Sequence, residues 1–318
     1  MDSDSQVNKI KRHEMWRAQY RARRYMEHLA DDELRQRAKD IFLNLLVLEK
    51  NVKIGLLQMN SEGQQWMILC THILEEFSMR FGPYPAGFAD GFMQDLQIPY
   101  GPLAKRATEA VIARGTVLGN YLVKYGKAKY LKAAFESGSL RVAPASSYSD
   151  PSLHPAIHDK EMEFTIQPPG EFHIKVFDPE NGRVKGKLQP IGNKITISIQ
   201  SDYYVYCLSS LFAPRLFLDF NQADACLLIT KPQDFLERII NEFERVAPGC
   251  VTHDEPVHYF DPLSTLYDEV DIYFCKHFRY AYQKEYRIVW LPIEHRNKLE
   301  FFNLTLGSLE DVSELITV

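Results

Sequence analysis

The sequence has few cysteines, and no two of them stand close together. Its 318 residues include five cysteines, and no Cys-x-x-Cys pair occurs anywhere in the chain. Such scattered cysteines argue against a disulfide framework and against a structural zinc site of the usual spacing. An odd number of lone cysteines is typical of a reducing compartment, where each one packs as a small apolar side chain.

Long hydrophobic runs are missing as well. No uncharged apolar stretch approaches the ~20 residues that a membrane-spanning helix needs. The first residues, Met1 to Ser5, lack the basic-then-apolar order of a signal peptide. Both absences favour a cytoplasmic protein. The formal net charge of -5 argues against a globally basic nucleic-acid-binding protein, although a local basic patch stays open.

Four common catalytic motifs are absent. The chain contains no Gly-x-Gly-x-x-Gly after a strand pattern, no Gly-x-x-x-x-Gly-Lys, no Gly-x-Ser-x-Gly and no His-Glu-x-x-His. These motifs hold phosphates, present a nucleophilic serine or bind zinc. Their absence argues against a Rossmann dehydrogenase, a P-loop NTPase, an α/β-hydrolase and a zincin.

The chain does contain two regions of different pattern. Apolar residues at 4-3-4-3 spacing from Leu34 to Leu48 predict a helix, with further helices at about 64–79 and 103–113. Beyond residue 115, short runs rich in Val, Ile, Tyr and Phe predict strands. The strands are expected at 121–125, 140–143, 161–167, 172–177, 194–199, 203–208, 225–229 and 286–291, with helices at 128–137 and 233–246. We therefore expect a helical accessory region at 1–115 and an α+β catalytic domain at 116–318.

Basic and aromatic residues alternate near the N-terminus. Seven Lys and Arg residues lie between Lys9 and Arg24, with Trp16, Tyr20 and Tyr25 among or beside them. Such a helix can contact nucleic acid or an acidic partner. It can equally be a solvated helix face with aromatic side chains packed beneath it, and the sequence leaves both interpretations open.

Late in the chain an acid and an amide enter an apolar strand pattern. Gln283 and Glu285 stand two residues apart in segment 280–290, and strand side chains two apart lie on one face. On a rigid strand, the carboxylate can hold a sugar hydroxyl and stabilise positive charge on a ribose carbon, while the amide orients a nucleophile. The alternative is a salt-bridged sheet surface formed by Lys284, Glu285 and Arg287.

A metal site is a competing interpretation. His154, His158, Asp159 and Glu161 are close in sequence, and imidazole with carboxylate can hold a divalent ion. A metal-dependent hydrolase or nuclease would follow. The same segment also fits a Pro-rich loop with two exposed histidines, in which case no metal is expected. Cys207 lies in an apolar aromatic strand pattern without a nearby cation, so we expect its thiol to be inert.

Several segments together resemble known families. The run from Cys207 to Ser210 and the run from Tyr282 to Arg287 resemble an uncharacterised bacterial defence family with Cys-Phe-Ser and Glu-Lys-Glu-Trp-Arg strands. Their order also resembles ADP-ribosyltransferase toxins, in which a first strand bears Arg or His, a middle strand Ser-Thr-Ser or Tyr, and a late strand Gln-x-Glu or Glu-x-Glu. The resemblance covers roughly residues 116–310 and leaves out the first hundred. It departs at 218–225, where the bacterial family carries Trp-x-x-Tyr-x-x-x-His-x-Gly.

The resemblance implies a mixed two-sheet ADP-ribosyltransferase-like domain that takes NAD as substrate. It makes Glu285 the catalytic glutamate and Gln283 the amide on the acceptor side. Arg141 would supply a guanidinium for the pyrophosphate, because Lys124 stands where the transferases have Arg or His. The NAD-binding residues that it implies are Lys124, Tyr125, Arg141, Tyr204, Ser209 and Ser210.

The expected function is that of a toxin that transfers ADP-ribose to RNA, DNA or protein in bacterial toxin–antitoxin or antiphage defence. The resemblance implies an antitoxin protein as partner. Two alternatives stay open: a metal-dependent nuclease centred on the histidine segment, and a non-catalytic binding protein that uses the fold without the chemistry.

Overall fold

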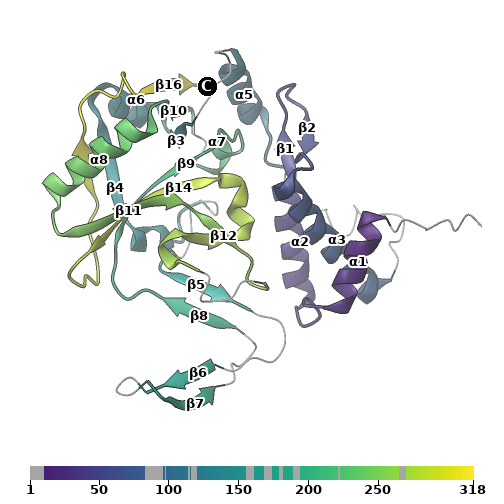
Figure 1. Cartoon of the computed structure of the whole chain (residues 1–318). Coiled ribbons are helices and arrows are strands. Elements are labelled where there is room, and N and C mark those ends of the chain that lie inside the picture. The colour runs from purple at the N-terminus through teal and green to yellow at the C-terminus, as the bar shows by residue number, and fades with distance from the viewer. Residues whose placement is uncertain are drawn as a thin grey trace, which may run out of the picture. The chain divides into compact units, whose positions relative to one another are not determined.

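The computed structural model describes residues 11–82, 96, 98–113, 115, 120–154, 161–167, 174–178, 182–188, 194–220, 223–264 and 270–318. Helices and sheets are both present, which confirms the expected α+β class. The chain divides into two compact units, whose elements are labelled in Figure 1. Unit 1 comprises residues 1–47 and 55–97, and unit 2 comprises residues 48–54 and 98–318. Among the described helices, none is long and apolar enough to cross a membrane.

The described residues of unit 1 form three helices: α1 (Arg12–Ala22), α2 (Asp31–Leu45) and α3 (Ser61–Phe81). The predicted apolar stripe is confirmed as far as Leu45, because Leu34, Ala38, Ile41 and Leu45 are all buried on α2. Its last member, Leu48, lies in a strand instead of the helix. A short hairpin of β1 (Leu46–Leu48) and β2 (Ile54–Leu56) follows α2. At the start of α3, the side chain of Asn60 accepts a hydrogen bond from the backbone N–H of Gly63 at 2.9 Å, which caps the helix.

Arginines in α1 and just after it form ion pairs with acidic residues of the same unit. Arg17 and Arg21 both pair with Glu75 of α3, the second at 2.5 Å. Arg24 pairs with Glu76 at 2.9 Å. The aromatic residues Trp16 and Tyr20 of the same helix are buried. The alternation of basic and aromatic residues thus produces a helix whose rings pack inside the unit, while Arg17 and Arg21 pair with Glu75 from the solvent side.

The boundary between the units lies earlier than the sequence indicated. Helix α5 (Pro102–Ala113), which we expected to belong to the accessory region, is part of unit 2. Its Ala107 is fully buried in a cluster that includes Phe217, Leu228 and Ile316. The reason is packing: the apolar side of α5 covers the sheet of unit 2, and helical periodicity alone does not show which core a helix joins.

An eight-stranded sheet forms the centre of unit 2. Its strands lie in the order β11-β14-β9-β3-β10-β16, while β4 pairs with both β9 and β15. All of these pairings are antiparallel. The strands are β3 (Leu122–Gly126), β4 (Ser139–Pro144), β9 (Tyr204–Ser209), β10 (Ala225–Ile229), β11 (Cys250–Pro256), β14 (Glu285–Pro292), β15 (Phe302–Thr305) and β16 (Ser313–Thr317).

Two strands diverge along one edge of β9. On one side β14 pairs with β9 from Tyr204 to Ser209. On the other side β3 meets β9 only at Ser209, whereas β4 meets it only at Tyr204 and Val205. Among the described strands, none pairs with the middle of β9 on that edge. The sheet therefore opens between β3 and β4, and a side chain has to fill the gap.

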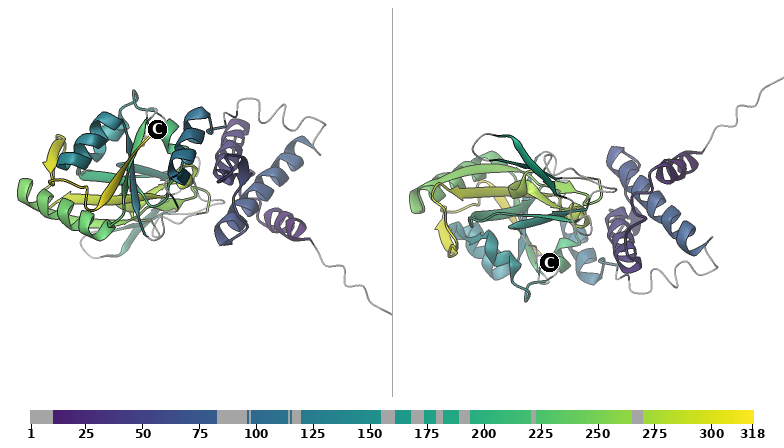
Figure 2. Two further views of the ribbon diagram at one scale, coloured as in Figure 1. Left: turned by 90° about the horizontal axis from the view of Figure 1, so that it is seen from above. Right: turned by 90° about the horizontal axis from the view of Figure 1, so that it is seen from below.

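Helices cover both faces of this sheet, as the two views of Figure 2 show. Helices α6 (Ala128–Ser137) and α8 (Pro232–Val246) pack with the sheet in one large core. In that core, the ring of Phe243 stacks on Trp290 with 4.2 Å between centroids. Helices α5 and α7 (Leu216–Asp219) and the 3-10 turns η1 (Ala145–Ser149) and η4 (Ile272–Phe274) contribute to separate clusters on the other face.

Three further strand pairs complete unit 2. Strand β5 (Glu163–Ile166) pairs with β8 (Ile195–Ser198), β6 (Ile174–Phe177) with β7 (Val184–Leu188), and β12 (His258–Phe260) with β13 (Cys275–His277). The 3-10 turn η5 (Phe278–Gln283) connects β13 to β14.

The structure corrects one sequence-based placement in that connection. Gln283 ends η5 instead of lying on the strand with Glu285, and Lys284 between them adopts a left-handed conformation with φ of 46°. Gly138 ends α6 in a left-handed conformation with φ of 67°, the usual place of glycine after a helix.

Candidate active site

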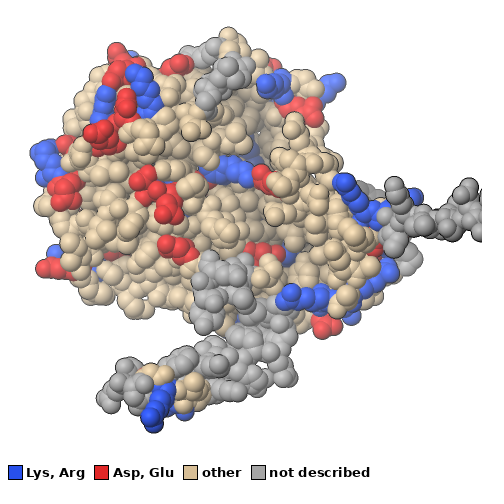
Figure 3. Space-filling view, viewed as in Figure 1, with Lys and Arg blue, Asp and Glu red and all other residues tan. Residues whose placement is uncertain are grey.

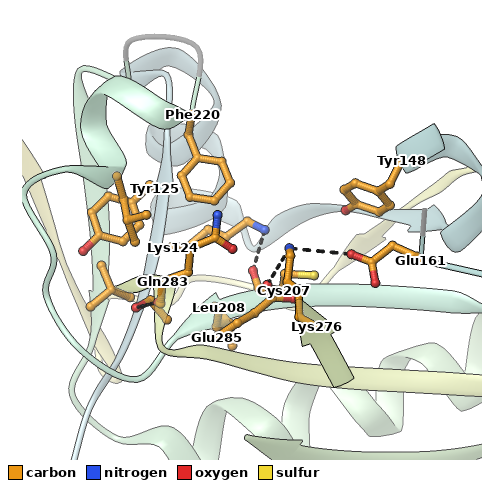
Figure 4. Close-up of a pocket in the computed structure, with 13 residues that line it drawn as sticks. Lys124, Tyr125, Tyr148, Glu161, Cys207, Leu208, Phe220, Lys276, Gln283 and Glu285 are labelled. Carbon is orange, nitrogen blue, oxygen red and sulfur yellow. Dashed lines mark hydrogen bonds and ion pairs between the residues drawn. The ribbon is translucent and has the colours of Figure 1, made fainter. Parts of the chain in front are cut away.

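A cavity of about 190 Å³ lies in unit 2 where β3, β9 and β14 come together. Figure 4 shows its side chains, which come from segments far apart in the sequence. Five of the residues expected to act in catalysis or NAD binding line this cavity: Lys124, Tyr125, Ser209, Gln283 and Glu285. The other lining residues are Val123, Tyr148, Glu161, Cys207, Leu208, Leu216, Phe220 and Lys276.

Glu285 is the first residue of β14 and reaches the cavity by strand alternation. In the antiparallel register, Glu285 lies opposite Ser209 and Arg287 lies opposite Cys207, so all four share one face. Tyr286, between Glu285 and Arg287, and Ile288, the next residue, point to the other face. Glu285 is buried, and its backbone N–H donates to the Tyr259 hydroxyl at 2.7 Å.

The Glu285 carboxylate is held by two cations. Lys276 Nζ lies 3.0 Å from one oxygen and Arg287 Nε lies 2.7 Å from the other. Burial alone would raise the pKa of Glu285, but the charges of Arg287 and Lys276 lower it well below its ordinary value. The carboxylate is therefore ionised at neutral pH even though it is desolvated.

Glu161 joins the same network from the segment before β5. Its carboxylate lies 2.6 Å from Arg287 Nη2, at an ion-pair distance, and 3.7 Å from Lys276 Nζ. Two acids and two bases thus alternate, and all four side chains are at most 6% exposed. This finding corrects the expectation of a salt-bridged sheet surface: Glu285 and Arg287 do pair, but they pair inside the unit.

Lys124 occupies the gap between the diverging strands. Its Nζ donates to the backbone carbonyl of Cys207 at 2.7 Å and lies 4.2 Å from the centre of the Tyr206 ring. The carbonyl of Cys207 is on the edge of β9 where β3 and β4 separate, so the lysine replaces a missing strand partner. Burial lowers the pKa of Lys124, which the neighbouring Cys207 and Glu285 only partly offset.

The serines brace the backbone before Glu285. Ser209 Oγ lies within hydrogen-bonding distance of the carbonyls of Gln283 and Leu211, at 2.6 and 2.7 Å. Ser210 Oγ donates to the carbonyl of Lys284 at 2.9 Å, on the exposed side. These bonds tie the end of β9 to the turn that presents Gln283 and Glu285.

Aromatic rings form a wall of the cavity. Tyr125 and Phe220 are stacked with an interplanar angle of 10° and 6.2 Å between centroids. The Tyr125 hydroxyl accepts a hydrogen bond from the backbone N–H of Ala213 at 2.7 Å. Tyr148 of η1 faces the cavity near Glu161 (Figure 4). The cavity therefore combines flat aromatic walls with charged side chains, those of Glu285, Glu161 and Lys276.

Three expected NAD-binding residues lie outside the cavity. Arg141 is exposed on β4, where its guanidinium lies 3.8 Å from the centre of the Phe301 ring. Tyr204 points to the opposite face of β9 and donates to the carbonyl of Glu300 at 3.1 Å. Ser210 is exposed beyond the end of β9. Because neighbours in a strand alternate in direction, Tyr204 and Ser210 cannot share the face of Ser209.

The metal interpretation gains no support from the described part of the chain. No group of three or more His, Cys, Asp or Glu side chains in it has the arrangement of a metal site. The carboxylate of Glu161 is engaged by Arg287 and Lys276. His158 and Asp159 lie outside the described residues.

Sequence reasoning missed several of the residues that line the cavity, although some of them carried a usable signal. Lys276 stands in a segment with no strand or motif pattern around it, and only the tertiary structure brings it to Glu285. Arg287 carried a usable signal, because a charged residue inside an apolar strand pattern requires a buried partner. Cys207 does have cations nearby, Lys124 and Arg287, contrary to the expectation, but burial outweighs them and raises the pKa of its thiol.

In comparisons with known proteins, no family model matches the chain, and neither the curated proteins nor the solved structures give a match. The function must therefore be argued from the cavity itself.

Proposed function

We propose that unit 2 transfers ADP-ribose from NAD to an acceptor, with Glu285 as the catalytic carboxylate. One observation carries the proposal: a carboxylate that is kept ionised lies in a cavity walled by aromatic rings. Cleavage of NAD breaks the bond between ribose C1′ and the nicotinamide nitrogen and builds positive charge on the ribose. A fixed negative charge beside that carbon stabilises the transition state more than the ground state.

The surrounding residues suit the other parts of this reaction. The stacked rings of Tyr125 and Phe220 offer a flat surface for nicotinamide. Gln283 lines the same cavity and would orient the acceptor atom that attacks C1′ and then gives up its proton. Lys124 would supply positive charge to phosphate oxygens, as a point charge rather than a fork.

Arg287 and Lys276 act on Glu285 rather than on the substrate. Their charges keep the carboxylate ionised, and their hydrogen bonds hold both of its oxygens in place. Their cost is a weaker negative potential at the ribose, because both cations lie within ion-pair distance of the Glu285 carboxylate. We therefore assign them positioning roles.

The wider biological role is part of the same proposal. A toxin that consumes NAD or modifies a host acceptor needs restraint in its own cell, and an antitoxin protein would provide it. The support for this role is the resemblance of the Lys124, Ser209 and Glu285 segments to such toxins.

The proposal is tested with the full chain and NAD labelled in the adenylate. We expect release of nicotinamide and transfer of label to one class among RNA, DNA and protein. Glu285→Gln should reduce the rate ~10²–10³-fold with little change in NAD affinity. Glu237→Gln, an exposed acid on α8, is the matched control and should keep the parental rate. A normally folded Glu285→Gln protein with the parental rate would disprove the assignment.

A second variant guards against simple unfolding, since Glu285→Gln leaves Lys276 and Arg287 with one acid between them. Gln283→Ala removes no charge from the network. We expect it to lower transfer to the acceptor while slow hydrolysis of NAD persists. Thermal unfolding of each variant separates loss of structure from loss of chemistry. If the wild-type chain neither binds nor cleaves NAD, the binding-protein alternative takes its place.

A further inference from the structure

A second cavity, of about 440 Å³, lies beside the first in unit 2. The two share Glu161 and Lys276 in their walls. Lys276 Nζ is 3.0 Å from Glu285 and 3.7 Å from Glu161. A group bound in the second cavity is therefore separated from the proposed catalytic carboxylate by a single lysine side chain.

The size of the two cavities shows that the first cannot hold a whole dinucleotide. Ligand pockets for molecules of that kind have volumes of about 300–1,000 Å³. The first cavity has about 190 Å³, enough for a ring and part of a sugar, whereas the second has about 440 Å³. A substrate or substrate pair that reacts at Glu285 must extend beyond the first cavity, and the second cavity adjoins it.

The lining of the second cavity combines aromatic rings and cations with the two acids Glu161 and Glu163. Phe164 and Phe260 meet edge to face with 5.6 Å between centroids, and His277 lies 6.0 Å from Phe260. Two cations lie near the ring of Tyr280: Lys276 Nζ is 4.9 Å from its centre, and the Arg279 guanidinium is 5.2 Å from it. Rings for stacking and cations for phosphate are the groups that bind nucleotides.

We propose that the second cavity binds a nucleoside phosphate, with the base against the Phe164 and Phe260 side and the phosphate at Arg279. This inference rests on the proposed function, because it assigns the cavity next to the reacting carbon. The nucleoside phosphate has two possible sources: the adenylate half of NAD, or a nucleotide of a nucleic-acid acceptor. Both present the same chemistry to the cavity.

AMP is the probe that tests binding without catalysis. We expect AMP to bind the full chain by calorimetry and Arg279→Ala to weaken it about 10- to 100-fold, as loss of a charge-assisted hydrogen bond does. Arg279 is exposed, so its replacement should leave thermal unfolding unchanged. Arg279→Lys should restore part of the affinity. Arg245→Ala, an exposed arginine on α8 with an acidic neighbour, is the matched control.

Kinetics then distinguish the two sources. If Arg279→Ala raises the KM for NAD in hydrolysis and leaves kcat unchanged, the cavity holds the adenylate of NAD. If hydrolysis is unchanged and transfer to an oligonucleotide falls, the cavity holds the acceptor. Either result supports the inference.

The inference fails if AMP does not bind, or if AMP binds wild type and Arg279→Ala equally. It also fails if only proteins accept the label and AMP does not compete with NAD. These outcomes leave the proposed function standing, because AMP binding requires no chemistry at Glu285. Conversely, AMP binding without any NAD cleavage counts against the proposed function alone.

Discussion

Each unit of the protein buries a pair of glutamates against cations, and the two networks differ in their access to water. In unit 1, Glu75 and Glu76 are fully buried or nearly so, but Arg17 and Arg21 expose 42% and 57% of their side chains. In unit 2, Glu285 meets Arg287, whose side chain has no exposed surface. The first network connects helices through arginines that keep between 15% and 57% of their side chains exposed, whereas the second is desolvated on both sides and lines a cavity.

This difference separates a structural network from a candidate catalytic one. Exposed cations are screened by solvent and contribute little beyond holding the helices. Desolvated charges interact more strongly and cost more to bury, so a protein keeps them mainly where their field has a use. The position of Glu285 in a cavity, and not its pairing, is what suggests chemistry.

The largest expected effect on stability is at Glu76, which accepts hydrogen bonds from Arg24, Arg80 and Tyr20. Glu76→Gln removes the negative charge that faces the buried Tyr20, the mostly buried Arg80 and the partly buried Arg24, and breaking such a pair costs about 3–5 kcal/mol. We expect the free energy of unfolding measured with urea to fall by that amount. NAD turnover per folded molecule should stay at the wild-type rate. Glu27→Gln, an exposed acid of the same unit, is the control. An equal loss of turnover in Glu76→Gln would remove the contrast between the networks.

The second prediction concerns stability at low pH, to which the glutamates of both networks should contribute in the same direction. Burial raises the pKa of Glu76, but hydrogen bonds from its arginine and tyrosine partners outweigh this and lower it below the ordinary 4.5. Glu285 is lowered as well, with burial again opposed by its cations.

A carboxylate with a lowered pKa in the folded state stabilises the protein above about pH 4.5, and that stability is lost as the pH falls further. We expect the wild-type unfolding free energy to fall below pH 4.5, and to fall less steeply in Glu76→Gln. Urea titrations at pH 3.5 and pH 7 measure this difference. If the unfolding free energy falls by the same amount in both proteins between pH 7 and pH 3.5, the partners of Glu76 do not lower its pKa.

The smallest expected effect is at Lys124, and its sign is opposite. Lys124 is desolvated between β3 and β4 with a backbone carbonyl and a ring as its close contacts. Lys124→Met keeps the length and removes the buried charge, so we expect a gain of about 1 kcal/mol in stability. NAD affinity should fall, because the charge is lost from the cavity. Lys129→Met, at an exposed position on α6, controls for surface effects. If Lys124→Met is less stable and binds NAD normally, the lysine stabilises the opening between β3 and β4 and does not contribute to NAD binding.

The sequence predicted the local features of the fold well. The apolar spacing of α2, the strands β3, β9, β10 and β14, and the glycine after α6 are all present. Alternation along β14 also predicts that Glu285 and Arg287 share a face. It failed at Gln283, because the left-handed Lys284 interrupts the strand there, and a lysine in that conformation has no signature in hydrophobic periodicity.

The sequence by itself determined which residues can be neighbours along a helix or strand, since that depends on periods of about 3.6 and 2 residues. Only the tertiary structure decided that Lys276 and Glu161, from a short strand and a preceding segment, complete the charge network of Glu285. Only the tertiary structure decided that β3 and β4 separate at β9 and leave room for Lys124. The physical reason is that these contacts depend on how strands pair and how connecting segments pack, and both are set by the burial of the whole core rather than by any local pattern.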